Sequence, residues 1–273
     1  MQHLTSFSEP STGLAFVPTM GALHDGHLAL IRQARNVGKK VLVSVYVNPT
    51  QFESTDDLAK YPKKLEQDVK LAESAGADFL WTPSVTEIYP EGLAKVKLIP
   101  AGSLGDMYEG ASRPHHFSGV LTVINRLFAI VQPEFAIFGE KDFQQLFLIR
   151  RFAREFFPNI QILAGATVRD KNGIALSSRN ARLSPAELAM AKVLPRAQEN
   201  ARGSATVIAL KASLEQTLHF EPGFTLDYAQ VVDPKSLLPV ADDLRGVVQV
   251  LLAGWIGSVR LIDNFPLEVK GQP

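Results

Sequence analysis

The chain has 273 residues, no cysteine, and equal numbers of basic and acidic side chains, 28 of each. The lack of cysteine excludes thiolate catalysis, disulfide bonds and cysteine-ligated metals, and the zero net charge excludes a global electrostatic attraction to nucleic acid or an anionic membrane. A chain of this length is long enough for one large domain or two ordinary ones, with a core that needs no covalent or metal support.

Neither the start of the chain nor its most apolar stretch has the pattern of a targeting or membrane segment. The first thirteen residues, MQHLTSFSEPSTG, lack the basic and then apolar order of a secretory signal. The stretch VVQVLLAGWIG at 247–257 is too short to span a bilayer and is typical of a core strand. Together with the missing cysteines, these features predict a soluble, cytoplasmic protein.

In the first part of the chain, β-rich apolar runs alternate with helical patterns. The run KVLVSVYVN at 40–48 is nearly continuous in apolar residues, as in a strand covered on both faces. The alternation predicts an α/β fold, a doubly wound and mostly parallel sheet of the Rossmann-like kind over residues 1–167. Strands are expected at 13–19, 40–48, 77–83, 134–140 and 159–168, and helices at 27–38, 61–76, 117–133 and 142–157.

From about residue 168 the pattern changes. Ser184, Pro185 and Glu187 suit the N-cap, first and third positions of one long helix at 184–201. A second helix is expected at 205–220, and short turns separate three strand patterns that predict a small antiparallel sheet. Residues 168–273 are therefore expected to form a smaller α+β domain, with strands at 225–233, 246–256 and 259–265.

Three polar loops follow predicted strands: PTMG at 18–21, NPTQF at 48–52 and GEKD at 139–142. In open α/β sheets, ligands bind beyond the carboxyl ends of the strands. All three loops are therefore expected to point into one crevice.

The stretch PTMGALHDGH at 18–27 places His24 and His27 on one face of the first turn of a helix. The unpaired N–H groups and partial positive charge of a helix N-terminus attract phosphate, and Gly26 lets a ligand approach the backbone. Two alternatives stay open. The pair can be partly exposed histidines at a helix end, or part of a zinc site, although no third ligand stands at a suitable spacing.

The other candidate groups also have plain structural readings. Lys141 can meet a polyphosphate as a point charge or be a solvated residue, and Asp142 can cap a helix, hold a ribose hydroxyl or contact Mg²⁺. The segment RDKNGIALSSRN at 169–180 can close over phosphate with hydroxyls and a guanidinium, or it is a polar hairpin between domains. The segment NPTQF at 48–52 and the pair Gln144–Gln145 offer amides that suit a substrate with hydroxyls and a carboxylate.

Several common sites are excluded by their missing motifs. The sequence has no G-x-x-x-x-G-K-[ST] phosphate loop, no G-x-G-x-x-G after the first strand and no G-x-S-x-G elbow. The segment SRPHHFSGV at 112–120 adds a local cluster of Arg113, His115 and His116, which can steer an anion or be a solvated loop.

Taken together, PTMGALHDGH, YVNPTQF, GEKDFQQL and ALSSRN resemble the pantoate–β-alanine ligase (pantothenate synthetase) family of the H-x-G-H nucleotidyltransferase superfamily. The resemblance runs from about residue 13 to about residue 265, with the motifs in the family's order. It implies a ligase of pantothenate biosynthesis, in the coenzyme A pathway. Pantoate is first adenylated by ATP with release of pyrophosphate, and the amine of β-alanine then displaces AMP to form an amide.

The resemblance also implies roles for particular residues. His27 is expected to be the proton donor, acting with His24, Lys141, Ser177, Ser178 and Arg179 on the phosphates. Gln51 and Gln145 are expected to hold pantoate, with Gln51 also near β-alanine. Mg²⁺ is expected to bridge the phosphates, held mostly by substrate and water, with Asp68 as its protein partner. The ATP site is expected to be lined by Met20, Gly21, Ala22, Leu23, His24, Asp25, Gly26, His27, Gly139, Glu140, Lys141, Asp142, Val168, Leu176, Ser177, Ser178 and Arg179.

The smaller domain is expected to act as a lid, and the protein to be a homodimer through its first domain. Two residues depart from the family pattern: His115 stands where glycine is usual, and Lys63 where arginine is usual. Two other functions stay open. One is cytidylyl or adenylyl transfer by another H-x-G-H enzyme, which does not predict the paired glutamines. The other is a nucleotide-binding protein without catalysis, which does not explain His24, His27, Lys141 and Arg179 together.

Overall fold

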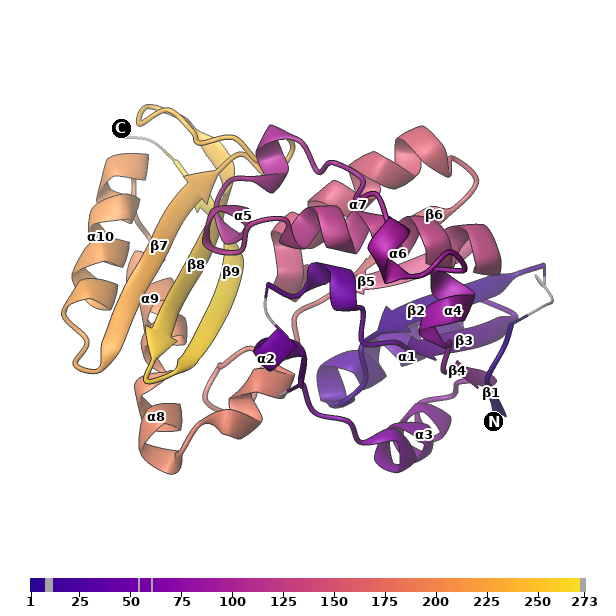
Figure 1. The fold of residues 1–273 in the computed structure, drawn as a ribbon. Coiled ribbons are helices and arrows are strands. Elements are labelled where there is room, and N and C mark those ends of the chain that lie inside the picture. Colours follow the sequence, from indigo (N-terminus) through magenta and orange to yellow (C-terminus); the bar gives the residue numbers. More distant parts are fainter. Residues whose placement is uncertain (8–11, 54, 60, 271–273) are drawn as a thin grey trace. The chain divides into compact units, whose positions relative to one another are not determined.

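The computed structural model describes residues 1–7, 12–53, 55–59 and 61–270. The chain divides into two units, Met1–Thr167 and Val168–Pro273, and Figure 1 shows the elements of each. Residues 8–11 of the polar N-terminal stretch lie outside the described ranges. No helix in those ranges combines the length and apolar character needed to cross a membrane.

The first unit is built on a six-stranded sheet in which every pair of neighbours is parallel. The strand order is β1-β4-β3-β2-β5-β6, which confirms the predicted α/β fold. The strands are β1 (Gln2–Leu4), β2 (Leu14–Thr19), β3 (Lys40–Val45), β4 (Phe79–Trp81), β5 (Phe135–Gly139) and β6 (Gln161–Gly165).

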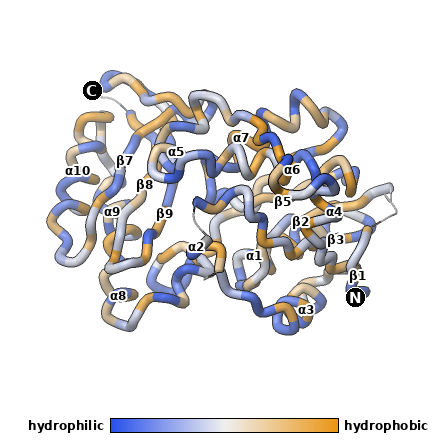
Figure 2. Tube along the Cα trace, in the orientation of Figure 1, coloured by the Kyte–Doolittle hydropathy of each residue, from blue (hydrophilic) through white to orange (hydrophobic). Residues whose placement is uncertain are grey.

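Alternation along the strands sends side chains to two different cores. Phe16 and Leu42 pack with the helices α6 (His116–Val131) and α7 (Phe143–Phe156), whereas Val17 and Val43 pack with α1 (Asp25–Val37) and α3 (Leu65–Ser74). Both faces are therefore covered, which is why the central strands are apolar throughout. In Figure 2, α6 is hydrophobic over much of its length, whereas α3 alternates. The helices of this unit are α1 (Asp25–Val37), α2 (Thr55–Ala59), α3 (Leu65–Ser74), α4 (Val85–Ile88), α5 (Glu109–Ser112), α6 (His116–Val131) and α7 (Phe143–Phe156).

The strand order reverses between β2 and β5. From β2 the chain adds β3 and β4 on one side, and β5 and β6 on the other. In doubly wound sheets such a switch point opens a crevice at the carboxyl ends of the strands. The loops after β2, β3 and β5 are the three polar loops of the sequence, so the predicted convergence is found.

The second unit packs helices on one face of a three-stranded antiparallel sheet with order β7-β8-β9. Val250 and Leu252 of β8 (Gly246–Ile256) lie in a core with Leu210 and Leu214 of α10 (Val207–His219). This agrees with the predicted antiparallel sheet. The elements are α8 (Pro185–Met190), α9 (Val193–Ala201), α10 (Val207–His219), β7 (Phe224–Val232), β8 (Gly246–Ile256) and β9 (Val259–Val269).

The structure differs from the sequence prediction at one expected helix and at several short elements that were not predicted. The single helix expected at 184–201 is wrong, because the chain forms α8 and α9 with a break at Ala191–Lys192. Pro195 has no N–H for the carbonyl of Ala191 and its ring would clash there, so the helix restarts and places the proline in its first turn. The elements that were not predicted are β1, a short polar edge strand without an apolar pattern, and the short helices α2, α4 and α5.

Candidate functional site

His24 and His27 cap the start of α1 reciprocally. His24 is the N-cap residue, and its Nδ1 accepts the backbone N–H of Gly26 at 3.2 Å. Nδ1 of His27 accepts the backbone N–H of His24 at 3.3 Å. This is the geometry of a capping box, with two imidazoles in place of the usual hydroxyl and carboxylate. The reading of the pair as helix-end histidines is therefore correct, but it uses only one nitrogen of each ring.

The other ring nitrogens are hydrogen-bond donors. Because Nδ1 accepts in both rings, the hydrogen-bond partners assign the proton of each neutral imidazole to Nε2. Burial, followed by the nearby ring of His24, lowers the pKa of His27 to about 3. Burial and then the charge of Lys141 lower the pKa of His24. With ring centroids 4.2 Å apart, the pair offers two neutral Nε2–H donors at pH 7.

Gly26 makes this arrangement possible. A Cβ at this position would lie 2.9 Å from Cε1 and 3.0 Å from Nδ1 of His24, closer than real contacts allow. The glycine of the motif therefore makes room for the His24 ring. The expectation from sequence was different, since it assigned the space to an approaching ligand.

Lys141 comes to the histidines from the neighbouring strand β5. It lies in a short 3-10 turn, Glu140–Asp142, that leads into α7, and its Nζ is 3.5 Å from Oδ1 of Asp142. Its charge lowers the pKa of both imidazoles, whereas that of Asp142 raises them. The structure thus brings His24, His27 and the Lys141–Asp142 pair together across the switch point.

Gln51 is held by a buried amide network after β3. Asn48 caps the 3-10 turn Pro49–Gln51 and donates from Nδ2 to Oε1 of Gln51 at 3.1 Å. Tyr89 donates its hydroxyl to Oδ1 of Asn48 at 2.9 Å. Nε2 of Gln51 in turn donates to Sδ of Met20 at 3.2 Å. The predicted pantoate amide thus lies against the first residue of the predicted ATP loop.

The two adjacent glutamines of α7 have different environments. Gln144 is buried, donates to the carbonyls of Leu104 and Met107, both at 2.8 Å, and accepts the N–H of Glu109. Its amide is therefore used in holding a loop. Gln145, the predicted pantoate residue, is partly exposed.

The side chain of Asp68 contacts the backbone of the predicted ATP loop. The carboxylate is buried and accepts the N–H of Ala22 at Oδ2, 3.0 Å, and of Leu23 at Oδ1, 2.7 Å. Within the described ranges, no three His, Cys, Asp or Glu side chains gather to form a metal site. The geometry of Asp68 is thus that of a backbone anchor and gives no support to its expected role as a metal partner.

Of the other predicted residues, Asp25 is the first residue of α1 and Gly139 the last of β5, whereas Val168, Leu176 and Ser177 to Arg179 belong to the second unit. The N–H of Leu176 donates to the carbonyl of Val168 at 2.9 Å, which closes the base of a hairpin. Ser177 caps a 3-10 turn over Ser178–Arg182 and accepts the N–H of Arg179 at 3.2 Å. Their roles toward ATP stay predictions.

Sequence reasoning assigned no role to Asn48 and Tyr89, and left His116 as part of a possible anion-steering cluster. His116 is buried, and its Nδ1 lies 2.9 Å from the carbonyl oxygen of Gln51. The Asn-Pro pair at 48–49 is a turn signal that could have indicated the capping role of Asn48. Tyr89 and His116 reach the site only through tertiary contacts.

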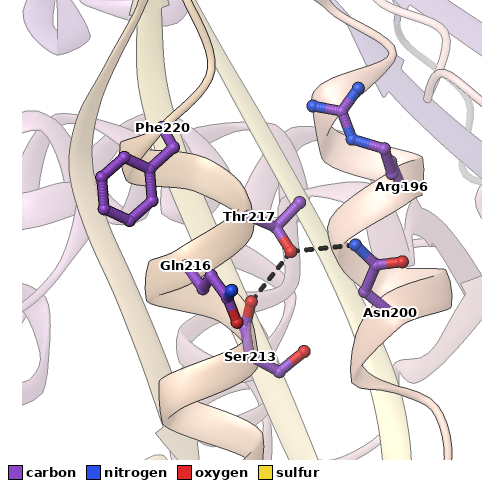
Figure 3. Close-up of a pocket in the computed structure, with 6 residues that line it drawn as sticks. All are labelled: Arg196, Asn200, Ser213, Gln216, Thr217 and Phe220. Carbon is purple, nitrogen blue, oxygen red and sulfur yellow. Dashed lines mark hydrogen bonds between the residues drawn. The ribbon is translucent and has the colours of Figure 1, made fainter.

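The second unit also carries a polar pocket between α9 and α10, with a volume of about 460 Å³. Figure 3 shows Asn200 donating to Thr217, which donates to the carbonyl of Ser213. No predicted site residue lines it. The lining consists of Arg196, Asn200, Ser213, Gln216, Thr217 and Phe220.

Comparisons with known proteins agree with the motifs. A family profile described as pantoate-beta-alanine ligase matches residues 1–266. The pantothenate synthetase of Rhizorhabdus wittichii is 46% identical over 261 residues, covering 93% of this chain and 91% of the relative. That of Thermus thermophilus is 46% identical over 265 residues, covering 95% and 94%.

Solved structures show the same similarity. A crystal structure of pantothenate synthetase from Thermus thermophilus has a TM-score of 0.91 at 43% identity, covering 97% of this chain and 99% of that one. A pantoate-beta-alanine ligase from Francisella tularensis, complexed with beta-gamma ATP and beta-alanine, has a TM-score of 0.75 at 37% identity, covering 92% and 88%. This chain belongs to the pantoate–β-alanine ligase family.

Proposed function

We propose that this protein condenses pantoate with β-alanine at the expense of ATP, through a pantoyl-adenylate intermediate. In the first step a carboxylate oxygen of pantoate attacks the α-phosphorus, and the bond to the β-phosphate oxygen breaks, releasing pyrophosphate. In the second step the amine of β-alanine attacks the acyl carbon, the bond to AMP breaks, and the amine loses a proton. The observation that carries the proposal is the cluster of His24, His27 and Lys141 at the switch point, in a chain of this family.

The phosphate end of the site uses fixed donors. The two Nε2–H groups, the N-terminus of α1 and the Lys141 ammonium are suited to oxygens of the α-phosphoryl group and departing pyrophosphate, where negative charge grows. A His27 ring with a pKa of about 3 is neutral in the free enzyme. We therefore assign it a hydrogen-bond donor's role, with full protonation only as phosphate charge raises its pKa.

The acyl end uses amides. Gln51 and Gln145 can donate to the pantoate carboxylate and accept from its hydroxyls, since an amide does both. The network of Asn48 and Tyr89 fixes Gln51 before substrate arrives, which reduces the entropy lost on binding. Gln51 is also proposed to lie near the β-alanine amine.

The second unit, residues 168–273, is proposed to act as a lid. Ser177, Ser178 and Arg179 would supply two hydroxyls and a guanidinium to the phosphates, and Val168 and Leu176 would border the nucleotide. The family resemblance supports this assignment, and so does the chemistry of the groups, since guanidinium and hydroxyl donors bind phosphate oxygens well.

Mg²⁺ is proposed to enter with ATP, bound by phosphate oxygens and water, as a small hard cation prefers. The described residues do not fit a protein cage for it, since no three His, Cys, Asp or Glu side chains among them gather at one point, and each oxygen of Asp68 already accepts a backbone N–H. No step is therefore assigned to a protein-bound metal. We also propose a homodimer acting in the cytoplasm, which light scattering and cell fractionation would test.

Pyrophosphate exchange tests the function directly. Labelled pyrophosphate should enter ATP only when pantoate is present, because adenylation needs the pantoate carboxylate to accept the adenylyl group. Exchange that depends on another acceptor would favour a different nucleotidyltransferase, and no exchange under any condition would favour a silent nucleotide binder. His27→Ala should abolish exchange with the fold intact, and unchanged turnover would remove His27 from the mechanism.

A further inference from the structure

The loop that leads into the histidine pair has a strained backbone. Gly21 and Ala22 both have positive φ angles, +83° and +51°. This region is open to glycine but costs an alanine roughly 1–2 kcal/mol. A strained conformation persists only when its surroundings hold it in place.

The carboxylate of Asp68 is the group that holds this loop. It comes from the first turn of α3, more than forty residues away in sequence, and its two oxygens accept the N–H groups of the consecutive residues Ala22 and Leu23. The residue is only 1% exposed. A Cβ on Gly21 would lie 3.0 Å from Oδ2, so the loop closely surrounds the carboxylate.

The backbone N–H groups of three successive residues each have a side-chain acceptor in this loop. Those of Ala22 and Leu23 point to Asp68, and that of His24 points to Nδ1 of His27. Once the first two are fixed, only φ and ψ of Leu23 remain to orient the peptide that carries the N–H of His24, because planar peptide units have only two soft torsions between them.

We propose that Asp68 is a positioning residue for the imidazole pair, which fixes the Gly21–Leu23 loop so that both Nε2–H groups face the phosphates of ATP. This inference rests on the proposed function of His24 and His27. It assigns Asp68 the role of holding the loop backbone in place of the metal-binding role expected from the sequence.

The direct test is Asp68→Asn, which keeps the shape but puts an NH₂ group against a backbone N–H. Misplacing catalytic donors by about 1 Å can cost on the order of 10²-fold in rate. We expect kcat for pyrophosphate exchange to fall by about that factor, with a smaller change in KM for pantoate. Long-range ¹H–¹⁵N spectra should show the imidazoles leaving the pure Nε2–H tautomer.

Asp78→Asn is the matched control. Asp78 also accepts a backbone N–H, that of Val41 at 2.8 Å, and an Arg35 guanidinium hydrogen bond at 2.6 Å, but at the amino-terminal ends of β3 and β4. It should lose stability while keeping kcat and the tautomers of His24 and His27. If Asp68→Asn unfolds, Asp68→Glu provides a second variant that retains the charge.

Two outcomes would overturn the inference. One is a folded Asp68→Asn protein with wild-type kcat and wild-type imidazole tautomers. The other is full recovery of its rate by added Mg²⁺, which would make Asp68 a metal partner. Both differ from failure of the proposed function, in which His27→Ala itself would keep full exchange activity.

Discussion

The backbone N–H of His24 donates to Nδ1 of His27, 3.3 Å away. This hydrogen bond within the motif uses Nδ1 of His27 and leaves its Nε2–H group for a ligand. Burial then disfavours the charged ring, and the pKa of His27 falls to about 3. The same pair that caps α1 is therefore kept neutral until an anion arrives.

The depressed pKa of His27 predicts acid sensitivity. An unfolded histidine titrates near about 6.5, so between that pH and the folded pKa of about 3 the unfolded chain binds more protons. The stabilisation that comes from keeping His27 neutral is fully present above about pH 6.5. As the pH drops below this value, the free energy of unfolding falls by at most about 1.4 kcal/mol per pH unit for one proton. Urea unfolding of His27→Asn should show a smaller loss between pH 7 and pH 5.

His219→Asn, which removes an exposed imidazole at the end of α10, is the control for losing any histidine. If His27→Asn and the wild type lose the same free energy over this range, the neutral ring assigned to His27 is incorrect.

Gly26→Ala should separate activity from stability. Alanine is a better helix residue than glycine by about 1 kcal/mol, but its Cβ would lie 2.9 Å from Cε1 of His24. The ring must rotate, so kcat/KM for ATP should fall roughly tenfold or more while thermal stability changes little. In the His24→Ala background the same substitution should have almost no further effect on rate, and an additive loss would show that Gly26 serves a ligand instead.

The sequence predicts those features of the fold and the site that depend on residues close together in the chain, and not those that depend on contacts between residues far apart in it. The strands after which PTMG, NPTQF and GEKD occur were predicted because local apolar patterns define them, and their convergence follows from parallel topology. The anchor at Asp68 could not be predicted, because it joins α3 to a loop more than forty residues away. Gln144 and Gln145 look alike in sequence, but adjacent helix positions face different directions, and only one of them turned out to be buried.

His115 offers a stability test at a departure from the family. It is the N-cap of α6 with φ +63° and ψ −4°, a left-handed conformation. The glycine expected there from the family pattern has no Cβ to clash, so His115→Gly should raise the free energy of unfolding by about 1 kcal/mol. Denaturant titration measures this. Gln132→Gly at the other end of the same helix, φ +46°, should behave similarly, and a loss of stability in both would contradict the strain argument.

The ion pair between Arg169 and Asp263 should keep the hairpin that leads to Ser177 and Arg179 in one ordered conformation. NH1 and NH2 of Arg169 lie 2.7 and 2.8 Å from the two oxygens of Asp263, which is 2% exposed. Removing one member of a buried pair leaves a charge without its partner and costs about 3–5 kcal/mol. Arg169→Ala should therefore destabilise the second unit strongly, and Arg169→Lys substantially, because an ammonium cannot form the bidentate contact. Limited proteolysis should then cleave 169–179 faster.

The exposed Lys211–Asp242 pair provides the control. Breaking it by Lys211→Ala should cost less than about 1 kcal/mol. Equal losses in the two variants would mean that burial gives the Arg169 pair no special weight, and the hairpin would have to be ordered by its own turn, in which Asp170 accepts the N–H groups of Asn172 and Ile174.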